Sequence, residues 1–326
     1  MKANRIVITG AAALAACGVL AMARPAVQAS SVSAATWTQQ APVTSPPARA
    51  NASMAYDAAT GTAVLFGGEG SLNRRLGDTW TSNGTTWTKQ APAASPRVRD
   101  YSAMAYDAAT RTVVLFGGDN RSGGLGDTWT WNGTTWTRRH PAASPAAQGG
   151  IAMAYDPATR SVVMFDSLDS RDTWTWNGTT WTKQAPATSP PVRAYAAMAY
   201  DAASGTVVLF GGEDPDGNLG DTWTWNGTTW TQQAPATSPT ARHGAAMAYD
   251  AATGTVVLFG GYDRSGVLSD TWTWNGIIWT KQAPATSPTA REDAAMAYDG
   301  ATRTAILFGG IDSSPGSYLG DTWTWG

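Results

Sequence analysis

Two hydrophobic patterns alternate along most of the chain. Runs such as Val256–Phe259 are apolar at every position, which predicts a short strand covered on both faces. Runs such as Thr271–Trp274 alternate threonine with tryptophan, and this period of two is typical of a pleated strand. In one representative stretch the patterns predict four strands, at Ala245–Tyr249, Thr255–Phe259, Thr271–Trp274 and Ile278–Lys281.

Turn residues separate these expected strands. Asparagine–glycine pairs such as Asn275-Gly276 stand between the third and fourth strands, and this pair favours a two-residue type I′ hairpin. Glycine doublets such as Gly117-Gly118 follow the second strand. They indicate a bulge or a backbone approach too close for a side chain.

The whole pattern recurs six times. Each copy begins with Met-Ala-Tyr-Asp, and the spacings between copies are 50, 49, 45, 49 and 49 residues. The six copies start at Met54, Met104, Met153, Met198, Met247 and Met296. Periods of this length are typical of propellers and solenoids. We therefore predict an all-β fold, a six-bladed β-propeller of four-stranded blades that spans residues 30–326.

The two ends of the repeat region complement each other. The last copy stops at Gly326 without its fourth strand, whereas Thr36–Pro42 repeats the fourth-strand sequence seen at Thr229–Pro235. We expect the N-terminal strand to complete the last blade and close the ring. Closure removes the open sheet edges that invite pairing with other chains, so we expect a monomer.

These residues resemble the kelch repeat. The resemblance rests on an arginine before the first strand, the glycine doublet after the second and the tryptophan near the end of each unit, and it covers residues 35–326. It implies a propeller like the central domain of galactose oxidase. Two units depart from the pattern, because Met164–Ser167 replaces Leu-Phe-Gly-Gly in the third and Ser82 replaces a tryptophan in the first.

Residues 1–29 have the features of an export signal. Lys2 and Arg5 precede an apolar run, and Val27–Ala29 matches the small-residue pattern before a cleavage site. Leu14–Cys17 also resembles a bacterial lipobox, which makes Cys17 a candidate lipidation site, and an uncleaved membrane anchor is a third possibility. We expect a secreted or cell-surface protein that contacts membrane only through such an anchor.

Composition then narrows the chemistry. The 17 tryptophans occupy repeated strand positions, which favours packing over sugar stacking, and removal of the signal leaves a net charge of about −5, which disfavours nucleic acid. No cysteine follows Cys17, and His140 and His243 are the only histidines. We therefore expect no cofactor and no metal site. Asp214–Asn218 is interpreted as an acidic turn, with weak calcium binding as the alternative.

The candidate binding surface is the face of the long loops, because the units differ most there. A recurring arginine on this face forms either framework ion pairs or a ring of donors for a ligand. The pairs that follow it differ in every unit and are candidates for specificity. The candidate residues are Arg49, Arg99, Asp100, Tyr101, Arg193, Tyr195, Arg242, His243, Arg291, Glu292 and Asp293.

The leading hypothesis is an exported, non-enzymatic propeller that binds a protein or glycan through this face. The alternative is a secreted carbohydrate-active enzyme. The resemblance includes galactose oxidases, whose copper site needs a cysteine that the mature chain lacks. It also includes bacterial sialic-acid epimerases, whose acid/base chemistry His243, Glu292 and Arg242 would supply.

Overall fold

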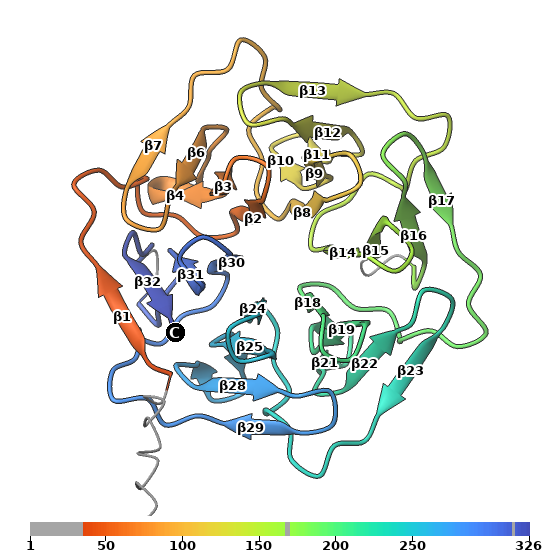
Figure 1. The fold of residues 1–326 in the computed structure, drawn as a ribbon, viewed down its shortest axis with the longest axis vertical. Helices are drawn as coiled ribbons and strands as arrows, with labels where there is room; N and C mark the ends of the chain where they lie inside the picture. The colour runs from red at the N-terminus through yellow and green to blue at the C-terminus, as the bar shows by residue number, and fades with distance from the viewer. Residues whose placement is uncertain (1–34, 167–169, 315–316) are drawn as a thin grey trace, which may run out of the picture. The chain divides into compact units, whose positions relative to one another are not determined.

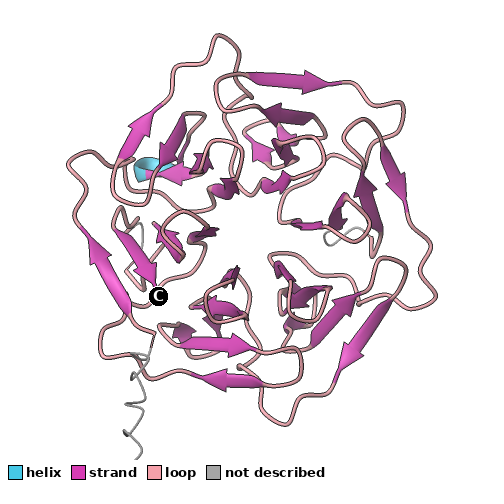
Figure 2. Ribbon diagram, in the orientation of Figure 1, coloured by secondary structure: helices cyan, strands magenta, loops and turns pink. Residues whose placement is uncertain are grey.

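The computed structural model describes residues 35–166, 170–314 and 317–326. The expected signal peptide and Cys17 lie outside the described residues, and the compact unit that is described is Ala35–Gly326. No helix in the described ranges is long and apolar enough to cross a membrane. One short 3₁₀ helix, η1 (Ser71–Asn73), interrupts a fold that is otherwise made of strands and loops (Figure 2).

Six antiparallel four-stranded sheets are arranged in a ring around a common centre, as the sequence predicts (Figure 1). In each blade the first strand lies innermost and the fourth outermost. Blade 1 consists of β2 (Ser53–Asp57), β3 (Thr62–Phe66), β6 (Thr79–Ser82) and β7 (Trp87–Lys89). Blade 2 consists of β8 (Ala103–Asp107), β9 (Thr112–Phe116), β12 (Thr128–Trp131) and β13 (Trp136–Arg139). Blade 3 consists of β14 (Ala152–Asp156), β15 (Ser161–Phe165), β16 (Thr173–Trp176) and β17 (Trp181–Lys183).

The remaining blades follow the same order. Blade 4 consists of β18 (Ala197–Asp201), β19 (Thr206–Phe210), β22 (Thr222–Trp225) and β23 (Trp230–Gln233). Blade 5 consists of β24 (Ala246–Asp250), β25 (Thr255–Phe259), β28 (Thr271–Trp274) and β29 (Trp279–Lys281). Blade 6 consists of β30 (Ala295–Asp299), β31 (Thr304–Phe308), β32 (Thr322–Trp325) and β1 (Trp37–Gln40). The predicted strands of blade 5 agree with these bounds to within one residue.

The N-terminal strand closes the ring. β1 pairs antiparallel with β32, with Trp37 opposite Trp325 and Gln40 opposite Thr322. The last blade is thus built from both ends of the repeat region, which confirms the predicted closure.

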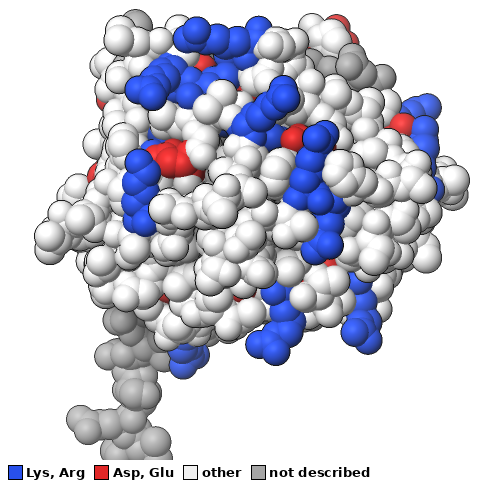
Figure 3. All heavy atoms as spheres, turned by 90° about the horizontal axis from the view of Figure 1, so that it is seen from above, with Lys and Arg blue, Asp and Glu red and all other residues white. Residues whose placement is uncertain are grey.

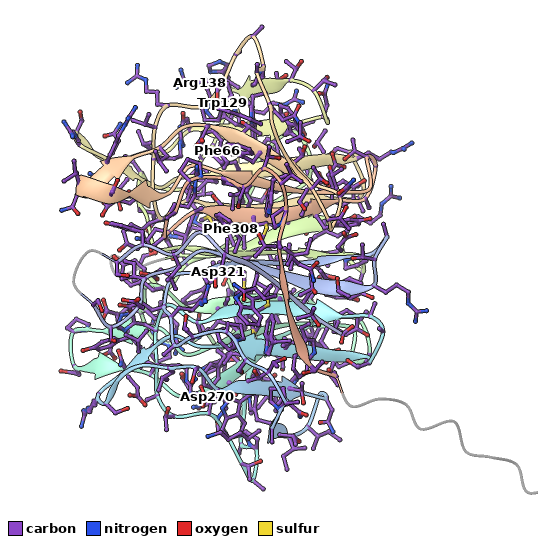
Figure 4. The ribbon with its side chains drawn as sticks, turned by 90° about the vertical axis from the view of Figure 1, so that its left-hand side faces the viewer. Phe66, Trp129, Arg138, Asp270, Phe308 and Asp321 are labelled. Carbon is purple, nitrogen blue, oxygen red and sulfur yellow. The ribbon has the colours of Figure 1, made fainter. Side chains whose placement is uncertain are left out.

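Tryptophan joins each blade to its neighbour. Trp37 is fully buried, and its Nε1 donates a hydrogen bond to Thr271 Oγ1 of the preceding blade at 2.8 Å. Equivalent bonds recur around the ring, from Trp87, Trp136, Trp181, Trp230 and Trp279. A phenylalanine of that preceding blade packs against the same ring, as between Phe66 and Trp136 at 5.5 Å and between Phe308 and Trp87 at 5.2 Å. Figure 4 labels Phe66 and Phe308 among the side chains of the propeller. The fourth-strand tryptophans are therefore core residues.

The hairpins between the third and fourth strands differ from the predicted type I′ turn. Gly133 has φ of +97°, but Asn132 is not among the residues with positive φ. The turn is instead closed by a bond from the Asn132 amide to the Thr135 carbonyl, which places Gly133 and Thr134 at its centre. Positive φ at the first central position is a feature of type II′ turns. Asn132 Oδ1 accepts from the amides of Thr134 and Thr135, which explains why asparagine precedes the glycine.

The glycine doublets allow neighbouring segments to approach closely, as predicted. A Cβ on Gly67 would lie 2.5 Å from the carbonyl oxygen of Arg99, and one on Gly68 equally close to that of Ala50. Short hairpins leave the sheets after four of the doublets: β4 (Glu69–Gly70) with β5 (Arg74–Arg75), β10 (Asp119–Asn120) with β11 (Gly123–Gly124), β20 (Glu213–Asp214) with β21 (Gly217–Asn218), and β26 (Tyr262–Asp263) with β27 (Gly266–Val267).

Candidate functional site

The recurring arginines are part of the framework and not of the binding surface. Arg49 is 1% exposed, and its guanidinium donates to both carboxylate oxygens of Asp78, at 2.7 and 3.0 Å, and to the Gly67 carbonyl. The same arrangement holds for Arg99 with Asp127, Arg193 with Asp221, Arg242 with Asp270 and Arg291 with Asp321. Of the two interpretations of these five arginines, the structure therefore supports framework ion pairs and contradicts a ring of ligand donors.

The pKa values of the partner carboxylates reflect this pairing. Burial raises the pKa of Asp78, but the hydrogen bonds and charge of Arg49 outweigh it and hold this pKa below its usual range. The indole of Trp80 adds a third hydrogen bond to the same carboxylate. Asp156 and the other aspartates that end the first strands instead accept hydrogen bonds from turn amides. Asp172 of blade 3, where Gln148 replaces the arginine, pairs with Lys183 at 2.6 Å.

Asp100 is likewise absent from the ligand-accessible surface. Its side chain is fully buried, and its carboxylate forms an ion pair with Arg75 Nε at 2.9 Å. Burial raises the pKa of Asp100 although Arg75 lowers it. We therefore remove Asp100 from the candidate binding residues.

One residue from each blade forms a closed ring of backbone hydrogen bonds at the channel mouth. The amide of each ring residue donates to the carbonyl of its counterpart in the preceding blade at 2.8–3.1 Å, and the bond from Asn51 to Asp293 completes the circle. We call these six residues the mouth ring: Asn51, Tyr101, Gly150, Tyr195, Gly244 and Asp293. All six have φ between +52° and +72°.

The left-handed conformation of the mouth ring is unusual for large side chains. Gly150 and Gly244 adopt it at little cost, but Tyr101 and Tyr195 adopt it at φ of +52° and +56°. Strained backbone of this kind persists where the surroundings impose it, and it clusters at ligand sites. Here the hydrogen bonds between blades impose it.

The mouth ring lines a cavity of about 180 Å³ together with the residues that follow it in each blade. A second cavity, of about 280 Å³, shares Tyr101, Tyr195 and Asp293 with the first and extends over His243 and Glu292. The rings of Tyr101 and Tyr195 lie 5.0 Å apart at an angle of 56°. We call this combined space the mouth cavity.

Acidic groups surround His243 at one side of the mouth cavity. Its Nε2 lies 3.5 Å from Glu292 Oε2, and its Nδ1 lies 3.5 Å from Glu213 Oε2 and 2.8 Å from Asn218 Oδ1. Burial lowers the pKa of His243, but the hydrogen bond to Glu292 and the charge of Glu213 outweigh it, so the net effect raises this pKa. His243 and Glu292, the pair that the enzyme alternative requires, therefore lie next to each other at this cavity.

The pKa of Asp293 is raised to about 7. The main cause is burial, and the negative charges of Glu292 and Glu213 add to it, while His243 acts in the opposite direction. Burial also raises the pKa of Tyr195, and the negative charges of Asp293 and Glu213 raise it further. The mouth cavity therefore carries an excess of negative charge that no described cation neutralises fully.

Five of the residues that line the mouth cavity are candidates named from the sequence. These are Tyr101, Tyr195, His243, Glu292 and Asp293. Asn51, which belongs to the variable pair that follows Arg49, and Glu213 on the same long-loop face line it as well. Glu213 directly follows a glycine doublet, at a position that differs between units, and this variation was the available signal.

Basic side chains lie elsewhere. Figure 3 shows Lys and Arg spread over the outer edge of the propeller on the side of β7 and β13. Arg74, Arg75 and Arg121 line a separate cavity of about 390 Å³. In the described ranges no three His, Cys, Asp or Glu side chains are grouped as a metal site requires. At the expected acidic turn, Asp214 Oδ1 accepts from the amides of Asp216 and Gly217.

Comparison with known proteins agrees with this architecture. The sequence profile of the KLHDC2/KLHL20/DRC7 Kelch-repeats domain matches residues 148–325, which is more than half of the chain. The solved structure of YjhT is similar, with a TM-score of 0.64 and 15% sequence identity over 86% of this chain and 95% of that one. At this identity the likeness concerns the fold alone. No curated protein sequence matches the chain.

Proposed function

Because the chain belongs to the kelch-repeat domain family, we propose that it is an exported, monomeric, non-catalytic propeller that binds a protein partner at its channel mouth. Kelch propellers commonly mediate protein binding. The observation that supports this site is the convergence of the most variable positions of the six blades on one cavity, while the rest of the framework repeats. Function is expected where such symmetry is broken on a rigid scaffold.

A glycan partner is less well supported than a protein. Indole faces are the usual platforms for sugar rings, but the fourth-strand tryptophans are 0–2% exposed. The mouth cavity offers instead two tyrosine rings tilted by 56° and a cluster of carboxylates. This combination suits an amino-acid side chain that brings hydrogen-bond donors.

A sugar-modifying enzyme is the second candidate function, and one observation favours it. His243 and Glu292 lie within 3.5 Å of each other, which brings an acid/base pair to the mouth cavity. The substrate-binding arginine of that hypothesis is not available, because Arg242 is 1% exposed and paired with Asp270.

Selection of a random peptide library on the protein, followed by affinity measurements, tests binding at the mouth. Tyr195→Gly is the informative variant, since glycine occupies the same ring position in two other blades. Thr134→Ala, on an exposed hairpin of the opposite face, is the matched control. We expect selected peptides to bind at least tenfold more weakly to Tyr195→Gly and equally to Thr134→Ala. Unchanged binding to both would refute the proposed site.

Turnover assays separate binding from catalysis. Aldoses and sialic acids are incubated with the protein, and anomer exchange and product formation are followed by NMR. We expect no turnover above the uncatalysed rate. Turnover that is lost in His243→Ala and Glu292→Gln would refute the non-catalytic proposal.

Export is proposed from residues 1–29 alone. Mass spectrometry of the mature N-terminus decides how the protein is released. A chain that starts at Ser30 indicates secretion, and a lipidated Cys17 indicates anchoring. A chain that retains Met1 would refute cleavage of the signal.

A further inference from the structure

We propose that the mouth cavity recognises a basic side chain, lysine or arginine, of the protein partner. This inference rests on the proposed function and adds the chemistry of the ligand to it. It follows from the charged and polar side chains of the mouth cavity that are not already held in ion pairs of the framework.

The charged groups that face the mouth cavity are mainly acidic. Glu213, Glu292 and Asp293 line it, whereas the five repeated arginines are held in buried ion pairs. Arg75 approaches the neighbouring blade but pairs with the buried Asp100 at 2.9 Å. His243 lies between Glu213 and Glu292 and neutralises them only when it is protonated. An incoming cation therefore finds a field of the opposite sign.

Asn51 gives a second and independent indication. It lines the mouth cavity next to Asp293, whose carbonyl accepts the Asn51 amide. Asn51 is 9% exposed, and no described residue donates a hydrogen bond to its Oδ1. A buried acceptor without a donor is costly, and buried polar atoms are normally satisfied. An ammonium or guanidinium group supplies N–H donors and has no acceptor, so it matches Asn51 Oδ1 and the Asp293 carboxylate together.

The two tyrosines complete the match. Tyr101 and Tyr195 place aromatic rings 5.0 Å apart at the mouth cavity, beside the acidic groups. Aromatic faces attract cations and also cover the aliphatic stem of a lysine or arginine. The two parts of the mouth cavity, of about 180 and 280 Å³, have room for the end of one such side chain.

Protonation changes should act on binding in one direction. The titratable groups that face Asp293 are Glu213, Glu292 and His243, and Tyr101 and Tyr195 approach from the other blades. Asp293 ionises near pH 7, and deprotonation of His243 removes a positive charge. Both changes make the mouth cavity more negative as the pH rises, while lysine and arginine stay cationic. Basic ligands should therefore bind more tightly at pH 8 than at pH 6.

The test compares peptides obtained by the library selection with versions in which each lysine or arginine is replaced by norleucine or glutamine. Affinities are measured by calorimetry for the wild type, Asp293→Asn, Asn51→Asp and the control Thr134→Ala. Asparagine occupies the ring position of blade 1, so the backbone at position 293 accepts it. Butylammonium and methylguanidine are titrated separately to show whether the cationic group binds without a peptide.

We expect a basic peptide to lose at least tenfold in affinity in Asp293→Asn and to gain in Asn51→Asp, with no change in Thr134→Ala. Its neutral version should bind the wild type at least tenfold more weakly. Peptides that need Tyr195 but contain no required basic residue, and that bind Asp293→Asn normally, would overturn this inference and leave the proposed function intact. Peptides that bind independently of Tyr195 would overturn the proposed function itself.

Discussion

Substitution of Trp37 by alanine tests whether the ring is weakest where the two chain ends meet. Trp37 is fully buried, its ring lies 5.1 Å from Phe259 and 5.4 Å from Trp325, and its Nε1 donates to Thr271 at 2.8 Å. Truncation of a buried tryptophan costs about 3–5 kcal/mol, which includes the cavity it leaves. This loss is a large part of the free energy of unfolding of a typical domain, which is about 5–15 kcal/mol.

Trp279 provides a matched control in blade 5. It is equally buried, lies 5.3 Å from Phe210 and 5.4 Å from Trp274, and donates to Thr222 at 2.9 Å. Trp279→Ala should therefore lose a similar packing energy. The difference is covalent, because β29 follows β28 through a hairpin, whereas no turn joins β1 to β32.

Hydrogen exchange measures this difference. In Trp37→Ala, β1 should detach locally, and the amides of β32 that face it should lose protection by at least tenfold. In Trp279→Ala the corresponding amides of β28 should stay protected, because the hairpin keeps β29 nearby. Trp37→Ala should also aggregate at lower temperature, since it exposes the edge of β32. Equal loss of protection in the two variants would refute the idea that closure depends on β1 packing.

Two further predictions concern charge. Asp221→Asn leaves the buried Arg193 without its counter-charge and should lower the free energy of unfolding by about 3–5 kcal/mol in chemical denaturation, whereas Asp214→Asn at the surface should change it by less than about 0.5 kcal/mol. The pKa of Asp221 is lower in the folded protein than in the unfolded chain, so its ionised carboxylate stabilises the fold above the unfolded pKa. This stabilisation is lost as the pH falls through the folded pKa. In Asp221→Asn the free energy of unfolding should therefore depend less on pH below about pH 4. The folded pKa of Asp293 is raised to about 7, so the stability associated with its protonated form is lost as the pH rises through this value. Asp293→Asn should consequently raise the free energy of unfolding at pH 8 by about 2 kcal/mol, a value that allows for the partial exposure of the side chain. At pH 4 the free energy of unfolding should be nearly unchanged. A variant that melts below the wild type at pH 8 would contradict the raised pKa.

The architecture was predictable because the same packing problem is solved six times. A tryptophan, a threonine and a phenylalanine at fixed positions make each contact between blades, as with Trp136, Thr79 and Phe66. Six copies of this solution leave little freedom except at the ends, where the missing fourth strand indicated closure. The hairpins were mispredicted because Asn132 acts through its side-chain oxygen and leaves the positive φ to Gly133 alone.

The repeated arginines have the same explanation as the repeated tryptophans. Arg193 and Asp221 lie 28 residues apart, and similar spacings recur in the other arginine-containing units. Both residues repeat with the framework, as the tryptophans do, and repetition that favours packing for one set favours it for the other. The sequence places a charged residue in a loop, but only the folded blade shows that the glycine doublet brings backbone over it and excludes water.

The mouth ring was beyond reach for a different reason. A tyrosine such as Tyr195 disfavours the left-handed conformation, so no local pattern predicts it there. The conformation is imposed by bonds from one blade to the next, and it turns the second residue of each variable pair toward the channel. Side chains that are unremarkable in their own units, including Asn51 and Asp293, thereby become neighbours across the junction of the first and last blades. The side chains of the mouth ring thus come from six positions about 49 residues apart, which become neighbours only when the ring closes.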